Sequence, residues 1–243
     1  MIKHRSRILT LAVLLVGIAT SATAVNMAFE DKFSSLNTSR WYVSNGWTNG
    51  PHQSCEWRAE NVATEDNKLL LTLSDNGGKV RPIGCAEIHT TDRLGYGLYQ
   101  ARLRTAAGSG LNTAFFTYIG PPHGVPEWDE IDFEFLGKDP SKVEVNHYAQ
   151  GKLIKGKVVD LGFDSSREFH DYAFDWTKDT IIWLVDGKEV YKTPPGVSIP
   201  RNPGYLFLSL WSGSAVEDAW MGPFSYSKPV TAEIASARFV PHE

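Results

Sequence analysis

The 243-residue sequence lacks most patterns that mark the common enzyme classes. It has no Gly-x-Ser-x-Gly motif, which argues against the nucleophile elbow of a serine hydrolase, and no phosphate-binding loop or dinucleotide fingerprint. No segment keeps an apolar repeat of 3.6 residues, so little helix is expected. No repeat, low-complexity stretch or charged linker divides residues 25–243. We therefore expect one domain in this part of the chain, built mainly of strands.

The first 24 residues have the layout of an export signal. Three Lys or Arg side chains precede an apolar run at 8–19, and small residues close the segment at Ala24. The run is too short to remain as a membrane anchor, and a buried N-terminal helix is the alternative interpretation. We predict that residues 1–24 are a cleaved signal peptide. The protein would then be secreted, either outside the cell or into a periplasm, with no membrane association after cleavage.

Positive charge is scarce once the signal peptide is removed. Residues 25–243 carry 21 Lys and Arg against 28 Asp and Glu, a formal net charge of −7. Nucleic acids and anionic membranes are bound through clustered Lys and Arg. We therefore expect neither as a partner. We also expect the protein to be a monomer.

Only two cysteines are present, Cys55 and Cys85. An oxidising compartment favours a disulfide between them. A zinc site is the alternative, but the two are not a Cys-x-x-Cys pair and no His spacing completes a ligand set. We predict a structural bridge.

The rest of the sequence has the residue pattern of a β protein. Apolar or alternating runs are separated by turn residues such as Gly, Pro, Asn and Asp. Asp186-Gly187 lies between two such runs and predicts a tight hairpin. The predicted strands include 68–73, 97–104, 113–119, 142–149, 170–176, 180–185 and 204–211. Many short strands in one domain predict an all-β fold, a two-sheet antiparallel β-sandwich of the jelly-roll type.

The segment from Trp128 to Phe135 is the most informative part of the chain. In a strand, alternate residues share a face, so Glu130, Asp132 and Glu134 point one way beside Trp128. The intervening Ile and Phe side chains form an ordinary core face. Three like charges in a row are costly, and such proximity raises the pKa of at least one of them.

Three interpretations compete for this strand. It could be a solvated acidic edge strand, because charge on edges discourages aggregation. It could bind calcium, although calcium sites usually take their oxygen ligands from irregular backbone. Glycoside hydrolysis is the third, and its retaining form needs two carboxyl groups about 5–5.5 Å apart. Residues i and i+4 lie about 13 Å apart along a straight strand, so curvature and side-chain orientation would have to close the difference.

The strand also resembles the signature of glycoside hydrolase family 16. Further segments resemble bacterial lichenases of that family in the same order: 44–50, 55–59, 96–99, 115–118, 135–139, 170–176 and 185–187. Within the family, the chain is most similar to rhizobial-type endo-1,3-1,4-β-glycanases that depolymerise succinoglycan. The laminarinase branch typically has one extra residue before the last Glu, and this chain lacks it.

The resemblance implies a concanavalin A-like jelly roll and a secreted, retaining endo-β-glycanase that hydrolyses β-1,3/1,4-linked polysaccharide. Residues 25–243 would be its catalytic domain. Glu130 would be the nucleophile, Glu134 the general acid/base, and Asp132 the residue that assists the nucleophile. The positions that match the family's substrate-binding residues are Trp47, Asn49, Glu87, Tyr118, Trp128, Asn146, Tyr148 and Trp211. Alternation independently places Glu144, Asn146 and Tyr148 on one face of their strand.

The sequence departs from the lichenase pattern at three positions. His89 stands where lichenases have Arg, and Ser212 where they have Asn. Both changes suit an acidic or substituted exopolysaccharide as substrate. Many family members bind a structural calcium through an Asp in the last strand, and the matching residue here is Ala235. We expect no cofactor, with a calcium held by backbone oxygens as the alternative.

Three other functions remain open. A mixed-linkage β-glucanase and a transglycosylase would use the same carboxylates, the second with a sugar acceptor in place of water. A non-catalytic glycan-binding sandwich would need neither outer carboxylate, since a fold does not determine a function.

The signal peptide gives a direct prediction. Cleavage after Ala24 means that exported protein begins at Val25, and N-terminal sequencing of that protein reads this residue. A start at any upstream residue contradicts the prediction.

Overall fold

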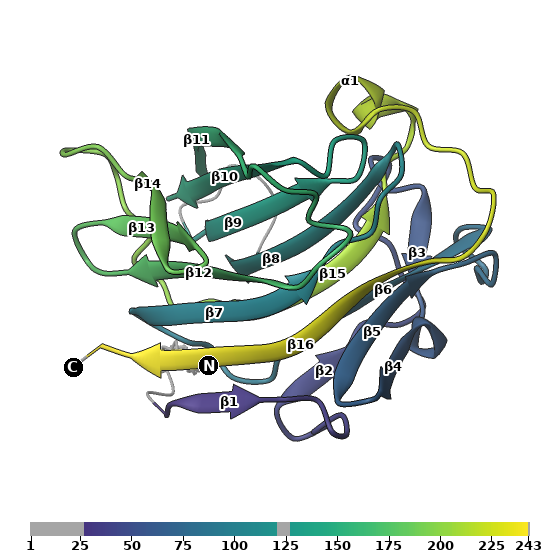
Figure 1. The fold of residues 1–243 in the computed structure, drawn as a ribbon, viewed down its shortest axis with the longest axis horizontal. Coiled ribbons are helices and arrows are strands. Elements are labelled where there is room, and N and C mark those ends of the chain that lie inside the picture. The colour runs from purple at the N-terminus through teal and green to yellow at the C-terminus, as the bar shows by residue number, and fades with distance from the viewer. Residues whose placement is uncertain (1–26, 121–126, 243) are drawn as a thin grey trace, which may run out of the picture.

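Two antiparallel sheets of eight strands each form the structure (Figure 1), a computed structural model that describes residues 27–120 and 127–242. The signal peptide predicted at 1–24 lies outside the described residues. The first sheet consists, in order, of β14 (Lys188–Lys192), β13 (Ile181–Val185), β12 (His170–Trp176), β7 (Gly97–Arg104), β16 (Val230–Pro241), β5 (Lys68–Leu73) and β4 (Val62–Glu65), with β1 (Phe29–Asp31) paired to β16.

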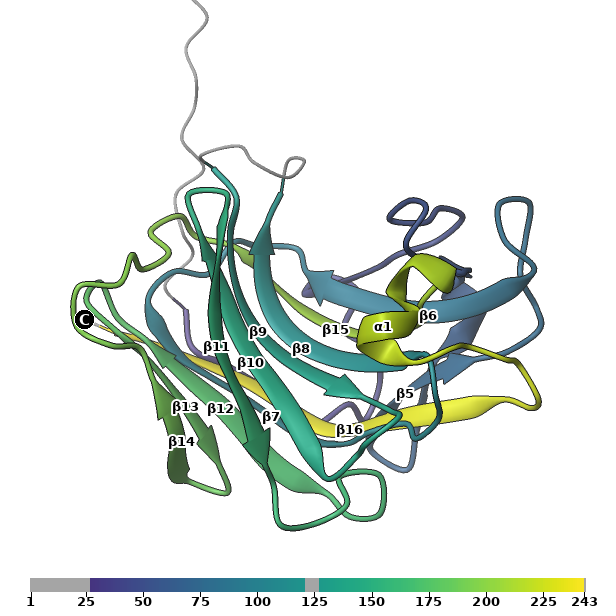
Figure 2. The same cartoon turned by 90° about the horizontal axis from the view of Figure 1, so that it is seen from above.

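The second sheet carries the acidic strand. Its order is β11 (Lys152–Asp160), β10 (Lys142–Ala149), β9 (Asp129–Leu136), β8 (Leu111–Ile119), β15 (Tyr205–Ser212), β6 (Ile83–Thr90) and β2 (Trp41–Val43), with β3 (Cys55–Trp57) parallel to β6. Strands β8 to β11 run side by side and curve together (Figure 2). The predicted strands are all present with small shifts of their ends. The list of predicted strands did not include β1 to β4, β6, β11 or β16.

The core lies between the sheets and follows from the alternation of side chains. Phe133 of β9 and Phe174 of β12 are both fully buried, and Phe115 of β8 packs against each of them. Tyr172 of β12 meets the edge of Phe135 at 4.6 Å between ring centroids. Aromatic pairs of this kind add to the free energy gained by burying apolar area. The predicted all-β sandwich is confirmed.

The turns and the small amount of helix also agree with the sequence. Asp186 and Gly187 join β13 to β14 with φ of 48° and 74°, the left-handed values that a two-residue type I′ hairpin requires. In the described ranges, helix is limited to α1 (Asp218–Met221) and two 3₁₀ segments, Ala59–Asn61 and Ala215–Glu217. None of these is long and apolar enough to cross a membrane.

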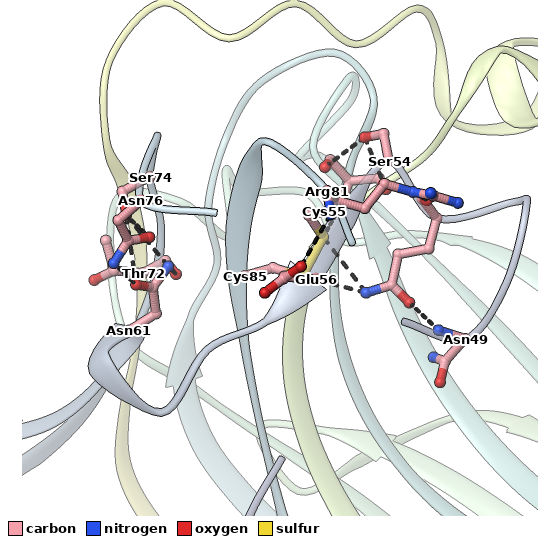
Figure 3. Close-up of a disulfide and its surroundings, with 12 residues drawn as sticks. Asn49, Ser54, Cys55, Glu56, Asn61, Thr72, Ser74, Asn76, Arg81 and Cys85 are labelled. Carbon is pink, nitrogen blue, oxygen red and sulfur yellow. Dashed lines mark hydrogen bonds between the residues drawn. A yellow bond between two sulfur atoms is a disulfide. The ribbon is translucent and has the colours of Figure 1, made fainter. Parts of the chain in front are cut away.

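The two cysteines form the predicted bridge, which joins β3 to β6 with 5.8 Å between the Cα atoms (Figure 3). The side chain of Gln53 donates from Nε2 to Sγ of Cys85 at 3.2 Å, and its Oε1 accepts the backbone N–H of Asn49. Ser212 at the end of β15 donates its backbone N–H to Sγ of Cys55. The bridge therefore anchors the loop that contains Asn49 to the sheet that carries the acidic strand.

Replacing both Cys55 and Cys85 with Ser is expected to lower the free energy of unfolding by about 3 kcal/mol, because the bridge closes a loop of about 30 residues in the unfolded chain. Urea unfolding of the oxidised protein and the double variant measures the difference. The reduced wild-type protein is the matched control and should unfold like the variant. Equal stability of oxidised and double-variant protein would contradict a structural role.

Candidate active site

Strand β9 lies in the interior of its sheet and not at an edge. It pairs with β8 along one side and with β10 along the other, and neither pairing shows a register shift. The interpretation of the segment as an acidic edge strand is therefore wrong. Ile131, Phe133 and Phe135 face the core with at most 1% exposure, so Glu130 and Glu134 lie on the opposite, outer face with Asp132 between them.

Glu130 is held by aromatic side chains. The indole N–H of Trp128 donates to Glu130 Oε2 at 2.6 Å, and the Trp128 ring stacks on Tyr148 with centroids 4.1 Å apart. In the strand register, Tyr118 of β8 and Tyr148 of β10 both lie opposite Glu130. Burial raises the pKa of Glu130 to about 7, although the hydrogen bonds with Trp128 and Asp132 lower it. The neutral indole N–H of Trp128 thus orients the carboxylate.

Asp132 is the most buried of the three acids, with 4% exposure. Burial and the charges of Glu130 and Glu134 hold the pKa of Asp132 well above its usual range. Its carboxyl group hydrogen-bonds Glu130. A protonated Asp132 can donate in that bond and stabilise the charged form of Glu130.

Glu134 has a different environment. Asn112 of β8 donates from Nδ2 to Glu134 Oε1 at 3.2 Å. Burial and the charge of Glu130 raise the pKa of Glu134 to about 8, and the bond from Asn112 only partly opposes this. Two hydrogen bonds, with Trp128 and Asp132, stabilise the charged form of Glu130, whereas the charged form of Glu134 has one from Asn112 and is opposed by the charge of Glu130. The arrangement therefore suits a nucleophile at Glu130 and a proton donor at Glu134.

Most of the predicted sugar-binding residues gather around this trio. Tyr118, Trp128 and Tyr148 surround Glu130, and Asn146 of β10 lies opposite Asp132 in the register. Trp211 of β15 pairs with Asn112, which places it toward the Glu134 end of the site. These positions agree with a surface on which a glycan would lie against aromatic rings and amide groups.

The other three candidates lie toward β3 and β6. The Trp47 side chain is partly exposed and meets Trp57 edge-on, and Asn49 is held by its backbone to Gln53. Glu87 is only 4% exposed and accepts a hydrogen bond of 2.7 Å from the hydroxyl of Ser44. Burial raises its pKa to about 7. In this structure Glu87 fastens the start of the loop that contains Trp47, and its contact with sugar stays a prediction.

The departures from the lichenase pattern have clear structural roles. His89 packs between Tyr42, Tyr205 and Phe207, and burial lowers its pKa, so it sits there as a neutral ring. Ser212 is fully buried and shares a 2.8 Å hydrogen bond with the hydroxyl of Ser54.

The expectation of no cofactor, with calcium on backbone oxygens as the alternative, stays a prediction. Within residues 27–120 and 127–242, no three His, Cys, Asp or Glu side chains lie together in a way that could hold a metal ion. Ala235 falls where β16 shifts register against β7, and it supplies no side-chain oxygen.

Sequence reasoning missed three residues of the site. Asn112 lies one residue before the strand as predicted, yet alternation back from Tyr118 through Phe116 and Ala114 would have placed it on the outer face. Glu144 was placed on the correct face but given no role. Trp220 of α1 donates from its indole N–H to Glu144 at 3.1 Å, and no local pattern signals a contact between residues 76 positions apart.

An antiparallel sandwich with two glutamates and an aspartate on alternate positions of one interior strand defines a carbohydrate-cleaving enzyme that uses paired carboxyl groups. This protein belongs to glycosyl hydrolases family 16, whose model matches residues 49–228. The resemblance noted from the sequence is confirmed, and the protein is a glycoside hydrolase.

Similar proteins cover most of the chain. It is 43% identical over 212 residues to the endo-1,3-1,4-beta-glycanase ExoK of Rhizobium meliloti (strain 1021), which spans 87% of this chain and 78% of that protein. A beta-glucanase of Paenibacillus polymyxa is 43% identical over 216 residues, covering 88% of each chain. The crystal structure of a beta-1,3-1,4-glucanase (lichenase) from a mouse hindgut metagenome is 41% identical, with a TM-score of 0.83 over 88% of this chain and 99% of that one.

The raised pKa of Glu134 predicts a pH-dependent stability. Between its ordinary pKa of 4.5 and the raised value near 8, the folded protein binds more protons than the unfolded chain. This group therefore lowers stability as the pH rises through that window. Replacing Glu134 with Gln removes this pH dependence. The free energy of unfolding of E134Q, relative to that of the wild type, should therefore rise by at least about 1 kcal/mol from pH 5 to pH 8.

Urea unfolding at both pH values measures this gain. Glu65→Gln, at an exposed glutamate of β4, is the control and should follow the wild type at both. An E134Q protein whose stability difference from the wild type is the same at pH 5 and pH 8 would contradict burial as the source of the raised pKa.

Proposed function

We propose that this protein is a retaining endo-1,3-1,4-β-glycanase that hydrolyses a β-1,3/1,4-linked polysaccharide. The main support is that β9 pairs with β8 and β10 without a register shift, which keeps Glu130, Asp132 and Glu134 on one outer face. The relatives named endo-1,3-1,4-beta-glycanase and beta-glucanase, at 43% identity over most of the chain, support the linkage.

In this mechanism Glu134 is the proton donor. It protonates the glycosidic oxygen while the carboxylate of Glu130 attacks the anomeric carbon, which forms a covalent glycosyl-enzyme and releases the leaving sugar. Glu134 then takes a proton from the incoming water, and the water oxygen replaces Glu130 at the anomeric carbon. Two displacements retain the configuration of that carbon.

The neighbouring residues support each step. Trp128 and Asp132 are hydrogen-bonded to Glu130 and limit its orientation. Asn112 holds Glu134 from the neighbouring strand. Preorganised donors of this kind lower the reorganisation that the transition state would otherwise require.

For the natural polymer we propose an acidic or substituted exopolysaccharide such as succinoglycan. The similarity to the Rhizobium meliloti endo-1,3-1,4-beta-glycanase supports this choice. Plain mixed-linkage glucan is the second candidate, favoured by the similarity to the Paenibacillus beta-glucanase. We further propose export from the cytoplasm and action as a monomer.

A substrate panel tests the proposal. The purified protein is incubated with succinoglycan, barley β-glucan, laminarin and carrageenan, and reducing ends are measured over time. We expect cleavage of succinoglycan or barley β-glucan, and Glu130→Ala and Glu134→Ala variants that fold by circular dichroism should each lose nearly all of it.

Two further readouts belong to the same experiment. Proton NMR of the first products should show the β anomer, which retention produces. Added oligosaccharide acceptors should leave hydrolysis dominant, and a transglycosylase would instead transfer most product to them. Activity confined to laminarin, an inverted anomer, or full activity in either alanine variant would overturn the proposal.

A further inference from the structure

A second glutamate lies directly opposite the proposed proton donor. Glu144 of β10 pairs with Glu134 of β9 in the antiparallel register. Side chains opposite each other in such a pair have Cβ atoms about 4.5–5.5 Å apart, and like charges there are destabilising. Glu144 shares the outer face with Asn146 and Tyr148 and is half-buried. A stability argument alone therefore gives no reason for a glutamate at this position.

The Glu144 carboxylate is held in place without being neutralised. Trp220 of α1 donates its indole N–H to Glu144 Oε2 at 3.1 Å. The Lys138 ammonium, just beyond β9, donates to the backbone oxygen of Trp220 and so ties α1 to the end of the strand. Among the described side chains, no Lys, Arg or His forms an ion pair with Glu144. A neutral donor orients the carboxylate and leaves its charge intact.

Titratable groups from three elements lie near Glu134, and most of them are carboxyl groups. Its own strand supplies Glu130 and Asp132, β10 supplies Glu144 and Tyr148, and the 3₁₀ segment before α1 supplies Glu217. From β8 it receives only the neutral amide of Asn112. The charges of Glu144 and Glu217 both act to raise the pKa of Glu134.

We infer that Glu144 is a positioning residue for the general acid: its carboxylate, oriented by Trp220 and directly opposite Glu134, keeps the proton on Glu134 at neutral pH. This inference rests on the proposed function, which makes Glu134 the proton donor. It assigns a role in the reaction to the sheet position beside the donor, where Trp220 of α1 orients the carboxylate.

Glu144→Gln tests the inference, because it keeps the shape and removes the charge. Barley β-glucan and succinoglycan serve as probes, and kcat/KM is measured from pH 4 to pH 10. The basic limb of the profile should move to lower pH by roughly one unit, the size expected for one charge about 6 Å away at intermediate dielectric. The position of the basic limb is read relative to each protein's own plateau.

Three variants separate charge from shape. Glu144→Asp keeps the charge, so its basic limb should lie close to the wild-type pH. Trp220→Phe keeps the charge and removes the donor, so its basic limb should not move to lower pH. Glu65→Gln removes a distant exposed charge and should leave the profile unchanged. A changed KM at every pH with an unmoved basic limb would mean that Glu144 binds sugar, and it would overturn the inference.

A second measurement does not depend on turnover. Carbon-13 NMR titration of the Glu134 side-chain carboxyl, in protein labelled at glutamate, should give a lower pKa in Glu144→Gln than in the wild type. If the wild type cleaves no glycan but this shift occurs, the proposed function fails and the electrostatic link stands. If the wild type cleaves glycan and neither the pH profile nor the titration moves, only the role of Glu144 fails. Should Glu144→Gln not fold, Glu144→Ala carries the same expectations.

Discussion

Strand β9 pairs with β8 from Asp129 to Leu136 and with β10 from Glu130 to Glu134, and neither pairing slips in register. Because side chains alternate with a period of two, one inserted residue would turn Glu134 toward the core unless a β-bulge absorbed it. The continuous pairing therefore decides both which acids face outward and which rings fill the sandwich. The register of β9 thus determines both the packing of the core and the composition of the site.

Strand β9 has one face whose burial stabilises the fold and another whose three acids lower its stability. Phe133 and Phe135 bury their rings among aromatic side chains of both sheets, and this burial offsets the free energy of holding three acids close together. The raised pKa values of the trio are the visible sign of that cost. A stable scaffold allows the outer face to keep an arrangement that would be unfavourable by itself.

The sequence predicted what depends on local pattern. Alternation placed Glu130 and Glu134 on one face, and the Asp186-Gly187 turn was read from two residues. Contacts between distant segments were beyond such reasoning: the bond from Asn112 to Glu134 spans 22 residues, that from Trp220 to Glu144 spans 76, and Ser44 reaches Glu87 across 43. These depend on strand order, which no local period determines.

The disulfide between Cys55 and Cys85 also restrains a loop of the site. Strands β3 and β6 pair over a parallel ladder of three residue pairs, and the disulfide adds a covalent restraint to that short contact. The Gln53 side chain, which bonds to Cys85 Sγ, also holds the backbone of Asn49. The oxidising compartment that favours the bridge therefore also favours an ordered loop with Trp47 and Asn49.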